Sequence, residues 1–383
     1  MKSLLPHEAP IRLGIAGLGM GSAHATSICT SSEIEIIAVA DPDKERHALL
    51  IEKVDELRKE EHLPPIGSTV EYYDDYRRMI DESNLDGIVI ALATHLHAEA
   101  SLYALEKGIA VLCEKPPTTH TESMVPVAQL ARQKGLVYLF GRQQRFSPRN
   151  QKIRTLIAEG ELGKVYMAQS SWYRTGWIPF RKGYGMNKKT GGGALLDLGI
   201  HQLDDGWFAM GCPQPVSVTC EMQCNFPHLT DGETLEVPYD ADDTTLALIR
   251  FEDGSVLSFL VTFALNSAGP ALQPIEKEGR AHWLELSLYG TKAGIEAHRN
   301  LITYRKGNSL DVEVRELLTE KIKSHLDLLK AQLLHFADCI RGRATPLNNA
   351  EQAIMLMQML DACRESAETG RSVQIENVEN LIQ

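Results

Sequence analysis

Residues 13–28 read LGIAGLGMGSAHATSI, and this stretch decides the fold of the first part of the chain. The apolar run Leu13–Ala16 predicts a strand, glycines follow it at every second position, and a helical pattern comes next. Glycines between a strand and a helix let the backbone approach a pyrophosphate, which then lies on the positive end of the helix dipole. The residues expected to line such a dinucleotide site are Gly17, Gly19, Met20 and Gly21.

The glycine pattern departs from the strict G-x-G-x-x-G fingerprint at its last position. That fingerprint would place its third glycine at Ser22, whereas Gly21 comes one residue earlier. Because serine is small, we expect it to allow the close packing of helix on strand that the third glycine normally allows. We therefore interpret the segment as a nucleotide-binding turn.

The next predicted strand, Ile34–Ala40, ends at Asp41. An acidic side chain about 20 residues beyond such a turn accepts hydrogen bonds from the adenosine ribose hydroxyls, and its charge repels a 2′-phosphate. Asp41 therefore favours NAD as the cofactor, and NADP stays as the alternative because Lys44 and Arg46 follow closely. The competing interpretation is that Asp41 only caps a helix that begins at Pro42.

Short apolar runs and helical patterns alternate over the first 145 residues. The apolar runs lie at residues 13–17, 34–40, 87–92, 110–113 and 136–140. The helical patterns lie at residues 97–107 and 122–134. Runs rich in Val, Ile and Leu are typical of parallel strands buried on both faces. This alternation predicts an α/β domain over residues 1–145, with a doubly wound parallel sheet of the Rossmann type.

The pattern changes after Phe146. A helix is predicted over residues 148–159, and two others, over 320–340 and 350–368, close the chain. Period-two strands lie between them, the clearest at residues 165–172, 244–251 and 255–263. Together these features predict an α+β domain over residues 146–383 with an open, mostly antiparallel sheet.

Composition limits the classes of function. Lys and Arg total 39 and Asp and Glu 51, a net charge of −12 that argues against a nucleic-acid partner. No apolar run approaches the ~18 residues of a membrane span, and the opening MKSLLPHEAP lacks a signal-peptide core. The seven cysteines include no C-x-x-C pair. We expect a cytoplasmic protein with no metal, membrane or nucleic-acid partner.

The apolar run that ends at Cys113 continues as Glu114-Lys115-Pro116. The carboxyl ends of parallel strands face the ligand crevice of a doubly wound sheet. A lysine there could place an ammonium beside a bound nicotinamide and a substrate oxygen. The competing interpretation is a solvated lysine at a strand end, and position alone does not choose between the two.

The glycine run 191–193 precedes a predicted helix that carries Asp197, His201 and Asp204. Residues three or four apart share one helix face. An imidazole beside a carboxylate is a plausible proton acceptor near neutral pH. Two structural interpretations compete with this one: a helix-surface pair, or a buried histidine that its neighbour satisfies.

Taken together, these segments resemble the glucose–fructose oxidoreductase/inositol dehydrogenase family, often written Gfo/Idh/MocA. The resemblance covers nearly the whole chain. The segments that carry it include GIAVLCEKPP (108–117), QQRFSPRNQKIRTLIAEGELGKV (143–165), GGGALLDLGIHQLDDGWFAMG (191–211) and LLHFADCIRG (333–342). The Glu-Lys-Pro element and the Asp-x-x-x-His helix are its two specific signatures.

The resemblance implies roles for individual residues. Lys115 would bind the reacting oxygen, His201 would be the general acid/base, and Asp197 would bind substrate and support the proton chemistry. Further residues expected near the cofactor are Thr94, His97 and Glu114, and further residues expected near the substrate are Trp172 and Arg174. The resemblance also implies a sugar-like substrate and a homodimer or homotetramer formed through the exposed face of the second sheet.

The chain departs from the family pattern at its loops. The segment 93–97 is shorter than in relatives and lacks their proline, which bears on the contacts expected from Thr94 and His97. The loops 178–189 and 226–243 look individual to this chain, and they are the ones expected to select the substrate.

These observations predict an NAD(P)-dependent oxidoreductase that moves a hydride between nicotinamide and a secondary alcohol or ketone of a sugar, cyclitol or derivative. One alternative keeps the same residues but regenerates NAD after a transient oxidation, as in redox-neutral sugar cleavage or isomerisation. Another is a nucleotide-sensing regulatory protein, for which acid/base groups would not be needed.

Overall fold

The structure is a computed structural model that describes residues 9–67, 69–174, 192–226, 239–266, 282–307, 309, 311–318 and 324–383. The chain divides into two compact units. The first comprises residues 1–147, 323–354 and 381–383, and the second comprises residues 148–322 and 355–380. The predicted loop 178–189 and most of the loop 226–243 lie outside the described residues.

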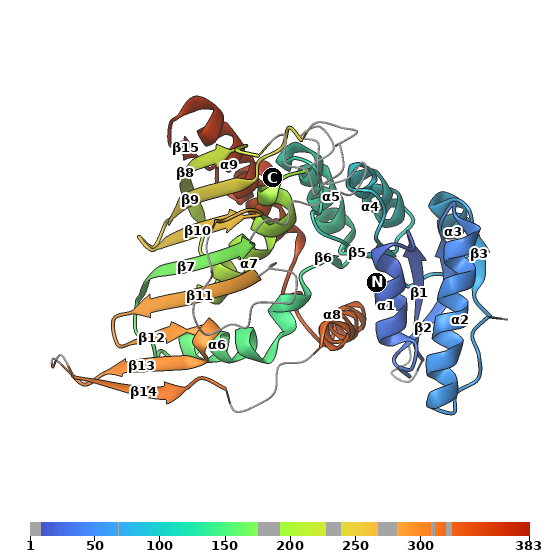
Figure 1. Cartoon of the computed structure of the whole chain (residues 1–383). Coiled ribbons are helices and arrows are strands. Elements are labelled where there is room, and N and C mark those ends of the chain that lie inside the picture. The colour runs from blue at the N-terminus through green and yellow to red at the C-terminus, as the bar shows by residue number, and fades with distance from the viewer. Residues whose placement is uncertain are drawn as a thin grey trace. The chain divides into compact units, whose positions relative to one another are not determined.

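The first unit is built on a six-stranded, fully parallel sheet in the order β3-β2-β1-β4-β5-β6 (Figure 1). Its strands are β1 (Ile11–Ala16), β2 (Ile34–Ala40), β3 (Glu71–Tyr73), β4 (Gly87–Ile90), β5 (Ala110–Cys113) and β6 (Tyr138–Phe140). Its helices include α1 (Met20–Ile28), α2 (Lys44–Glu60), α3 (Tyr76–Glu82), α4 (His97–Glu106) and α5 (Thr121–Lys134). This order reverses at β1 and β4, as in a Rossmann fold, and the prediction of a doubly wound sheet is confirmed.

Helix α8 (His325–Ile340) belongs to the first unit although it comes late in the chain. Leu333, Phe336 and Ala337 are buried in the same apolar cluster as the side chains of β1 and α1, and Figure 1 shows α8 beside α1. The division at residue 145 assigned this helix to the second domain, and the structure corrects it. Local periodicity reveals an amphipathic helix but not the sheet on which it packs.

Helix α8 also begins later than the predicted residue 320. Ser324 is its N-cap: the Ser324 hydroxyl accepts from the backbone N–H of Asp327, and the Asp327 carboxylate accepts from the backbone of Ser324. This reciprocal capping box starts the helix at His325.

The second unit is built on a nine-stranded sheet in the order β14-β13-β12-β11-β7-β10-β9-β8-β15. Its strands are β7 (Val165–Arg174), β8 (Pro215–Gln223), β9 (Thr244–Phe251), β10 (Val256–Thr262), β11 (His282–Gly290), β12 (Ala293–Glu296), β13 (Leu301–Arg305), β14 (Val312–Glu316) and β15 (Val373–Gln374). Only β7 and β10 pair in parallel among these described strands. The predicted open, mostly antiparallel sheet is confirmed.

Helices α6 (Pro148–Ala158), α7 (Ile200–Ala209) and α9 (Ala350–Thr369) accompany this sheet, and the short helix α10 (Val378–Leu381) follows. Helix α7 packs on β7, β10 and β11 (Figure 1). Gly206 makes the approach close, because a Cβ there would lie 2.7 Å from Cδ1 of Leu257. The sequence predicted one regular helix after the glycines, but residues Leu195–Gly199 form a π-helical turn before α7 begins.

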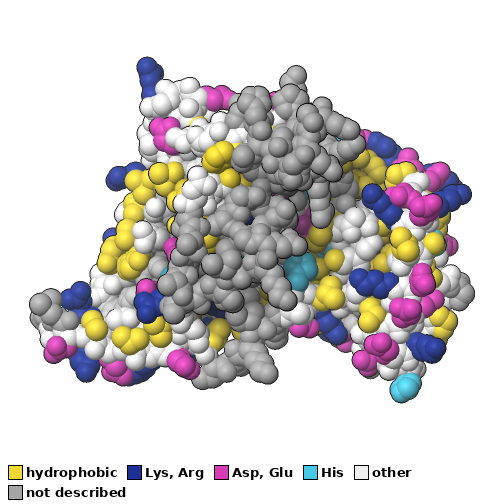
Figure 2. Space-filling model, in the orientation of Figure 1, with side chains coloured by type: hydrophobic (Ala, Val, Ile, Leu, Met, Phe, Trp, Pro, Cys, Tyr) yellow, Lys and Arg dark blue, Asp and Glu magenta, His cyan; other side chains and the backbone are white. Residues whose placement is uncertain are grey.

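Charged side chains of both signs mix on the surface of the first unit, as Figure 2 shows around α3 and α4. Arg77 pairs with Glu99, Arg78 with Asp74 and Glu82, and Lys107 with Asp81. An anionic ligand of this unit would therefore depend on local dipoles for its binding. Within the described residues, no helix has both the length and the apolar character required to cross a bilayer.

Candidate functional site

The glycine turn between β1 and α1 has the backbone form that phosphate binding needs. Gly17 has φ +87°, and a Cβ there would lie 2.4 Å from the carbonyl oxygen of Ala91, so no other residue fits without moving backbone. Gly19 is the N-cap of α1, and a Cβ there would meet nothing within 4 Å. The N-terminus of α1 is thus approachable by a ligand at Gly19, where its unsatisfied N–H groups and dipole favour an anion.

Gly21, rather than Ser22, provides the close helix–strand contact. A Cβ on Gly21 would lie 2.7 Å from Cγ2 of Ile15 on β1. Ser22 instead donates a hydrogen bond from its hydroxyl to the carbonyl oxygen of Leu18 at 2.6 Å. The close contact that the fingerprint assigns to its third glycine is thus made one residue earlier, at Gly21, and Ser22 does not prevent it.

Asp41 is buried at the carboxyl end of β2 and binds the glycine turn. Its Oδ2 accepts from the backbone N–H of Leu18 at 2.7 Å, and its Oδ1 accepts from that of Asp43 at 2.9 Å. Helix α2 begins at Lys44 with Asp43 as its N-cap, so the alternative that Asp41 caps this helix is wrong. The guanidinium of Arg46 lies 3.6 Å from Asp41. The ribose contact expected of Asp41 stays a prediction.

Thr94 follows β4, His97 is the first residue of α4, and both side chains are buried. Nδ1 of His97 lies 2.7 Å from the carbonyl oxygen of Pro116, and Nε2 lies 2.9 Å from that of Leu92. Burial lowers the pKa of His97, and a neutral imidazole has one N–H, so it donates to one of these carbonyls. His97 therefore holds the segment after Lys115 to the loop after β4. The cofactor contacts predicted for Thr94 and His97 stay predictions.

Glu114 and Lys115 follow β5 directly. Oε1 of Glu114 is 2.7 Å from Nε2 of His24, and Oε2 accepts from the backbone N–H of Lys115 at 3.0 Å. The carboxylate that we expected near the cofactor thus contacts helix α1 and the backbone of its own turn. His24 was not identified from the sequence. A histidine on the apolar face of a helix that must cover a parallel sheet is the signal that could have found it.

The structure brings four predicted residues of the second unit together. Nη1 of Arg174, at the end of β7, lies 3.8 Å from Oδ2 of Asp197. The Arg174 guanidinium lies over the rings of Trp172 and Phe263, at 5.0 Å and 5.5 Å from their centroids. The Trp172 and His201 rings meet edge to face with centroids 6.0 Å apart. Asp197, His201, Trp172 and Arg174 therefore form one cluster, whose catalytic and substrate roles stay predictions.

Asp242 anchors the start of the segment that carries Asp197 and His201. Its Oδ2 accepts from the backbone N–H of Leu195 at 2.8 Å and from the hydroxyl of Thr245 at 2.7 Å, and its carbonyl accepts from the N–H of Ala194. Gly193 has φ +112°, and a Cβ there would lie on Oδ1 of Asp242, at 1.9 Å. The sequence did not identify Asp242, because the segment that it anchors, at Ala194 and Leu195, lies more than 40 residues away in the chain.

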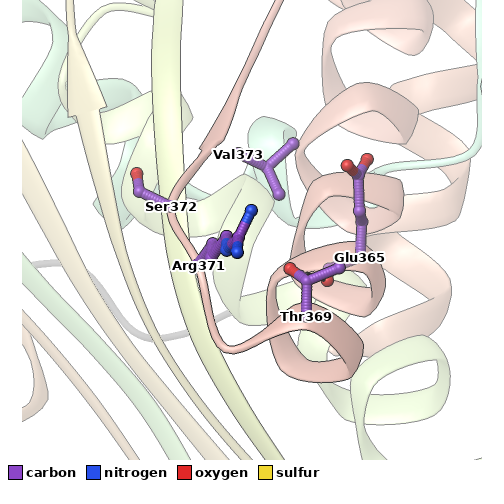
Figure 3. Close-up of a pocket in the computed structure, with 5 residues that line it drawn as sticks. All are labelled: Glu365, Thr369, Arg371, Ser372 and Val373. Carbon is purple, nitrogen blue, oxygen red and sulfur yellow. Dashed lines mark hydrogen bonds between the residues drawn. The ribbon is translucent and has the colours of Figure 1, made fainter.

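Asp204, on the next turn of α7, is fully buried. A pocket of about 430 Å³ lies elsewhere in the second unit, at the end of α9 and the start of β15 (Figure 3). Its lining consists of Glu365, Thr369, Arg371, Ser372 and Val373. None of these is a predicted site residue, so the pocket does not alter the assignment. No group of three or more metal-ligating side chains occurs among the residues that the structure describes.

Comparison with known proteins agrees with this geometry. The family model for the oxidoreductase NAD-binding Rossmann fold matches residues 11–142, and the model for the C-terminal alpha/beta domain of the same oxidoreductase family matches residues 154–375. The chain is 28 % identical to D-glucoside 3-dehydrogenase of Escherichia coli K12 over 98 % of this chain and 100 % of that protein. It is 22 % identical to scyllo-inositol 2-dehydrogenase (NAD(+)) of Bacillus subtilis 168, over 96 % and 97 %.

Among solved structures, levoglucosan dehydrogenase in complex with NADH and L-sorbose shares the fold, with a TM-score of 0.78 at 19 % identity, over 96 % of this chain and 99 % of that one. Two adjacent family models that together span most of the sequence establish the relationship. The chain belongs to the Gfo/Idh/MocA family of oxidoreductases and is an NAD(P)-dependent dehydrogenase.

Proposed function

We propose that this dehydrogenase oxidises a secondary hydroxyl of a sugar or cyclitol, reversibly, with His201 as the proton acceptor and Lys115 as the ligand of the reacting oxygen. The observation that carries the proposal is the cluster of Trp172, Arg174, Asp197 and His201 at the end of β7 and the start of α7. A carboxylate, a cation and an imidazole against an aromatic face are what recognition and deprotonation of a polyol require.

The residues of the first unit fit a dinucleotide. The open N-terminus of α1 at Gly19 suits its pyrophosphate, and the constrained turn at Gly17 brings the backbone close. Asp41, held by the N–H of Leu18, would receive the ribose hydroxyls. When bound, the nicotinamide supplies the hydride acceptor for oxidation and the hydride donor for reduction.

The chain's own residues handle the proton and the charge. An imidazole titrates near neutral pH, so His201 takes the hydroxyl proton in oxidation and returns it in reduction. The Lys115 ammonium stabilises negative charge that develops on the same oxygen. Asp197, beside Arg174, binds a neighbouring hydroxyl and orients it.

We propose NAD as the preferred cofactor because Asp41 is an anion at the place where NADP would bring its 2′-phosphate. Arg46, 3.6 Å away, reduces this repulsion in part. Comparing kcat/KM for NAD and NADP in the wild type and in Asp41→Ala measures the effect. Tighter binding of NADP than NAD by the wild type would contradict the preference.

The names of the relatives guide the choice of substrates. D-Glucoside 3-dehydrogenase matches this chain over its whole length, so we propose that glucosides are substrates, with anhydrosugars and inositols as the comparison set. The test is a panel of these polyols and the corresponding ketones, assayed with NAD, NADP and their reduced forms by the absorbance of reduced nicotinamide. Product formation without net change in this absorbance would favour the redox-neutral reaction instead.

Two variants test the residue roles. Lys115→Met and His201→Ala should keep nucleotide affinity but lose about 10²- to 10⁴-fold in turnover, because general acid/base and oxyanion-stabilising groups contribute in that range. Near-wild-type turnover in both variants would contradict the assignment.

We also propose that the protein forms a homodimer or homotetramer through the sheet face opposite α7. Leu246 and Leu248 on β9 are 49 % and 42 % exposed there, and neighbouring exposed apolar side chains on one face are a feature of interaction surfaces. Light scattering of the wild type and of Leu246→Lys tests this. A monomeric wild type at micromolar concentration would contradict it.

A further inference from the structure

A buried imidazole–carboxylate pair lies directly behind Lys115. Nε2 of His24 is 2.7 Å from Oε1 of Glu114, and these two side chains are only 0 % and 7 % exposed. The second carboxylate oxygen accepts from the backbone N–H of Lys115 at 3.0 Å. Glu114 therefore connects helix α1 to the backbone of the turn that carries the proposed oxygen-binding lysine.

The chemistry of the partners locates the proton between His24 and Glu114. Burial by itself raises the pKa of the Glu114 carboxyl, but its interactions with His24 and Lys115 together outweigh burial, and the pKa falls to about 2. A carboxylate only accepts hydrogen bonds, so Nε2 of His24 carries the hydrogen. Nδ1 of His24 is buried and has no hydrogen-bond partner within the described part of the chain. The contact with Glu114 is therefore the one hydrogen bond that the structure gives this imidazole.

The surroundings of Glu114 leave its carboxylate little freedom. A Cβ on Gly141 would lie 3.0 Å from the Glu114 carboxyl carbon, so the chain after β6 closes one side. The backbone N–H of Gly141 donates to the carbonyl of Cys113 at 2.6 Å, which ties that chain to the end of β5. With His24 on one oxygen and the N–H of Lys115 on the other, the carboxylate has a single defined position.

We propose that His24 is a positioning residue, which acts through Glu114 to fix the backbone of Lys115 relative to helix α1. The inference rests on the proposed role of Lys115 in binding the reacting oxygen. Because the N-terminus of α1 is the proposed pyrophosphate site, one helix then sets the position of both the cofactor and the lysine. Without the hydrogen bond from His24, the Glu114 carboxylate can rotate away from the backbone N–H of Lys115.

The experiment compares His24→Leu, His24→Gln and Lys115→Met with the wild type. Displacing a reacting group by about 1 Å costs up to about 10²-fold in rate, so His24→Leu should lose about 10- to 100-fold in kcat with KM and NAD affinity changed little. The amide of His24→Gln can donate to Glu114, so it should restore kcat to within about threefold of the wild type. His335→Gln is the matched control: His335 also has a hydrogen-bonded ring nitrogen in the first unit, at Leu347, and kcat should not change.

The double variant His24→Leu/Lys115→Met separates positioning from general stability. If His24 acts through Lys115, the leucine substitution should cost nothing further once the lysine is absent. A loss of the same size in both backgrounds would overturn the proposal, because it would mean that His24 supports the fold alone. If His24→Leu does not fold, Glu114→Gln provides the second test, since it keeps the side-chain shape and should lose kcat in the same lysine-dependent way.

The outcomes distinguish this inference from the proposed function. Wild-type turnover in Lys115→Met would remove the role of the lysine and with it the proposed function. Loss of turnover in Lys115→Met, together with wild-type kcat in folded His24→Leu, would overturn only the positioning role of His24.

Discussion

Two buried carboxyl groups bind the backbone next to proposed site residues, Glu114 in the first unit and Asp242 in the second. The two groups have different hydrogen-bond partners. Glu114 contacts an imidazole and a backbone N–H. Asp242 accepts from one backbone N–H and one hydroxyl, both uncharged groups. Each carboxylate binds the backbone of a segment that carries proposed site residues. Glu114 binds the turn of Lys115, and Asp242 binds the start of the helical segment with Asp197 and His201.

The difference in partners appears in the two pKa values. Burial raises the pKa of both groups, but for Glu114 the interactions with His24 and Lys115 together reverse this and lower the pKa to about 2. For Asp242 the hydrogen bonds from Thr245 and Leu195 only offset part of the effect of burial, and its pKa stays raised. An ionisable partner thus keeps a buried acid charged where neutral donors do not. Glu114, which holds the Lys115 turn, therefore stays ionised except at strongly acid pH. Asp242, which holds the Asp197–His201 segment, is protonated at a higher pH than Glu114.

The largest effect expected from this comparison is on stability. Glu114→Leu leaves a buried imidazole and a backbone N–H without their partner, and breaking a buried pair in this way costs about 3–5 kcal/mol. Asp242→Leu removes only hydrogen bonds to neutral donors, which costs about 1–3 kcal/mol. Urea unfolding followed by circular dichroism measures the first variant. Tryptophan fluorescence reports on the second variant, because Trp172, Trp207 and Trp283 lie in the second unit and the sequence ranges of the first unit contain no tryptophan.

Equal losses in the two variants would contradict the idea that an ionisable partner makes the difference. Ser255→Ala, at a turn hydrogen bond to Asp253 in the second unit, is a suitable control for fluorescence. It should shift the unfolding midpoint less than either leucine variant does.

The pH dependence of stability should have opposite sign for the two acids. The pKa of Glu114 falls from 4.5 to about 2, so its stabilisation, roughly 3 kcal/mol by linkage, is complete above about pH 5 and is lost as the pH falls through the folded-state value. The pKa of Asp242 is raised from 3.8, so its neutral form stabilises at low pH and this contribution is lost as the pH rises through the folded-state value. Denaturation of Glu114→Gln and Asp242→Asn at several pH values, each compared with the wild type, measures both slopes.

Glu114→Gln should flatten the acid side of the stability profile, and Asp242→Asn should gain relative to the wild type as the pH rises above about 4. If both variants changed the profile in the same direction, the assignment of the two pKa shifts would be wrong.

A smaller effect is expected at Gly193, beside Asp242. Gly193→Ala strains a residue at φ +112° and places its Cβ on the Asp242 carboxylate, so we expect a loss of about 1–3 kcal/mol and a fall in kcat. Gly254→Ala is the matched control, because Gly254 has φ +82° with nothing within 4 Å of its Cβ. Gly254→Ala should lower the stability through backbone strain but leave kcat unchanged. Equal kcat in the two variants would argue that Asp242 does not position the catalytic segment.

The sequence predicted what local patterns encode. Strand ends, the glycine turn, the Glu-Lys-Pro element and the residue spacing from Asp197 to His201 are all readable within short windows. The structure confirms the predicted strands that precede the glycine turn and the Glu-Lys-Pro element. The partners that position these residues were not predicted, because His24 bonds a residue 90 positions away and Asp242 one 47 positions away. The π-helical turn at Leu195–Gly199 was also missed, and the N–H of its first residue is bound by the distant carboxylate of Asp242.

The smallest effect is expected at Arg174, whose ion pair in the second-unit cluster is long and has a partly exposed partner. Its guanidinium lies 3.8 Å from an Asp197 side chain that is 38 % exposed, and such pairs contribute only about 0–1 kcal/mol to stability. Arg174→Met keeps an apolar chain against Trp172 and Phe263, so the unfolding midpoint should change little, whereas KM for the polyol should rise by about fivefold with kcat nearly constant. Arg174→Lys retains the charge without the planar group, so its KM for the polyol should lie between those of the wild type and Arg174→Met. A large loss in kcat with unchanged KM would instead mean that Arg174 stabilises the transition state. The second-unit cluster would then depend on exact side-chain positions, as is proposed for the Lys115 turn.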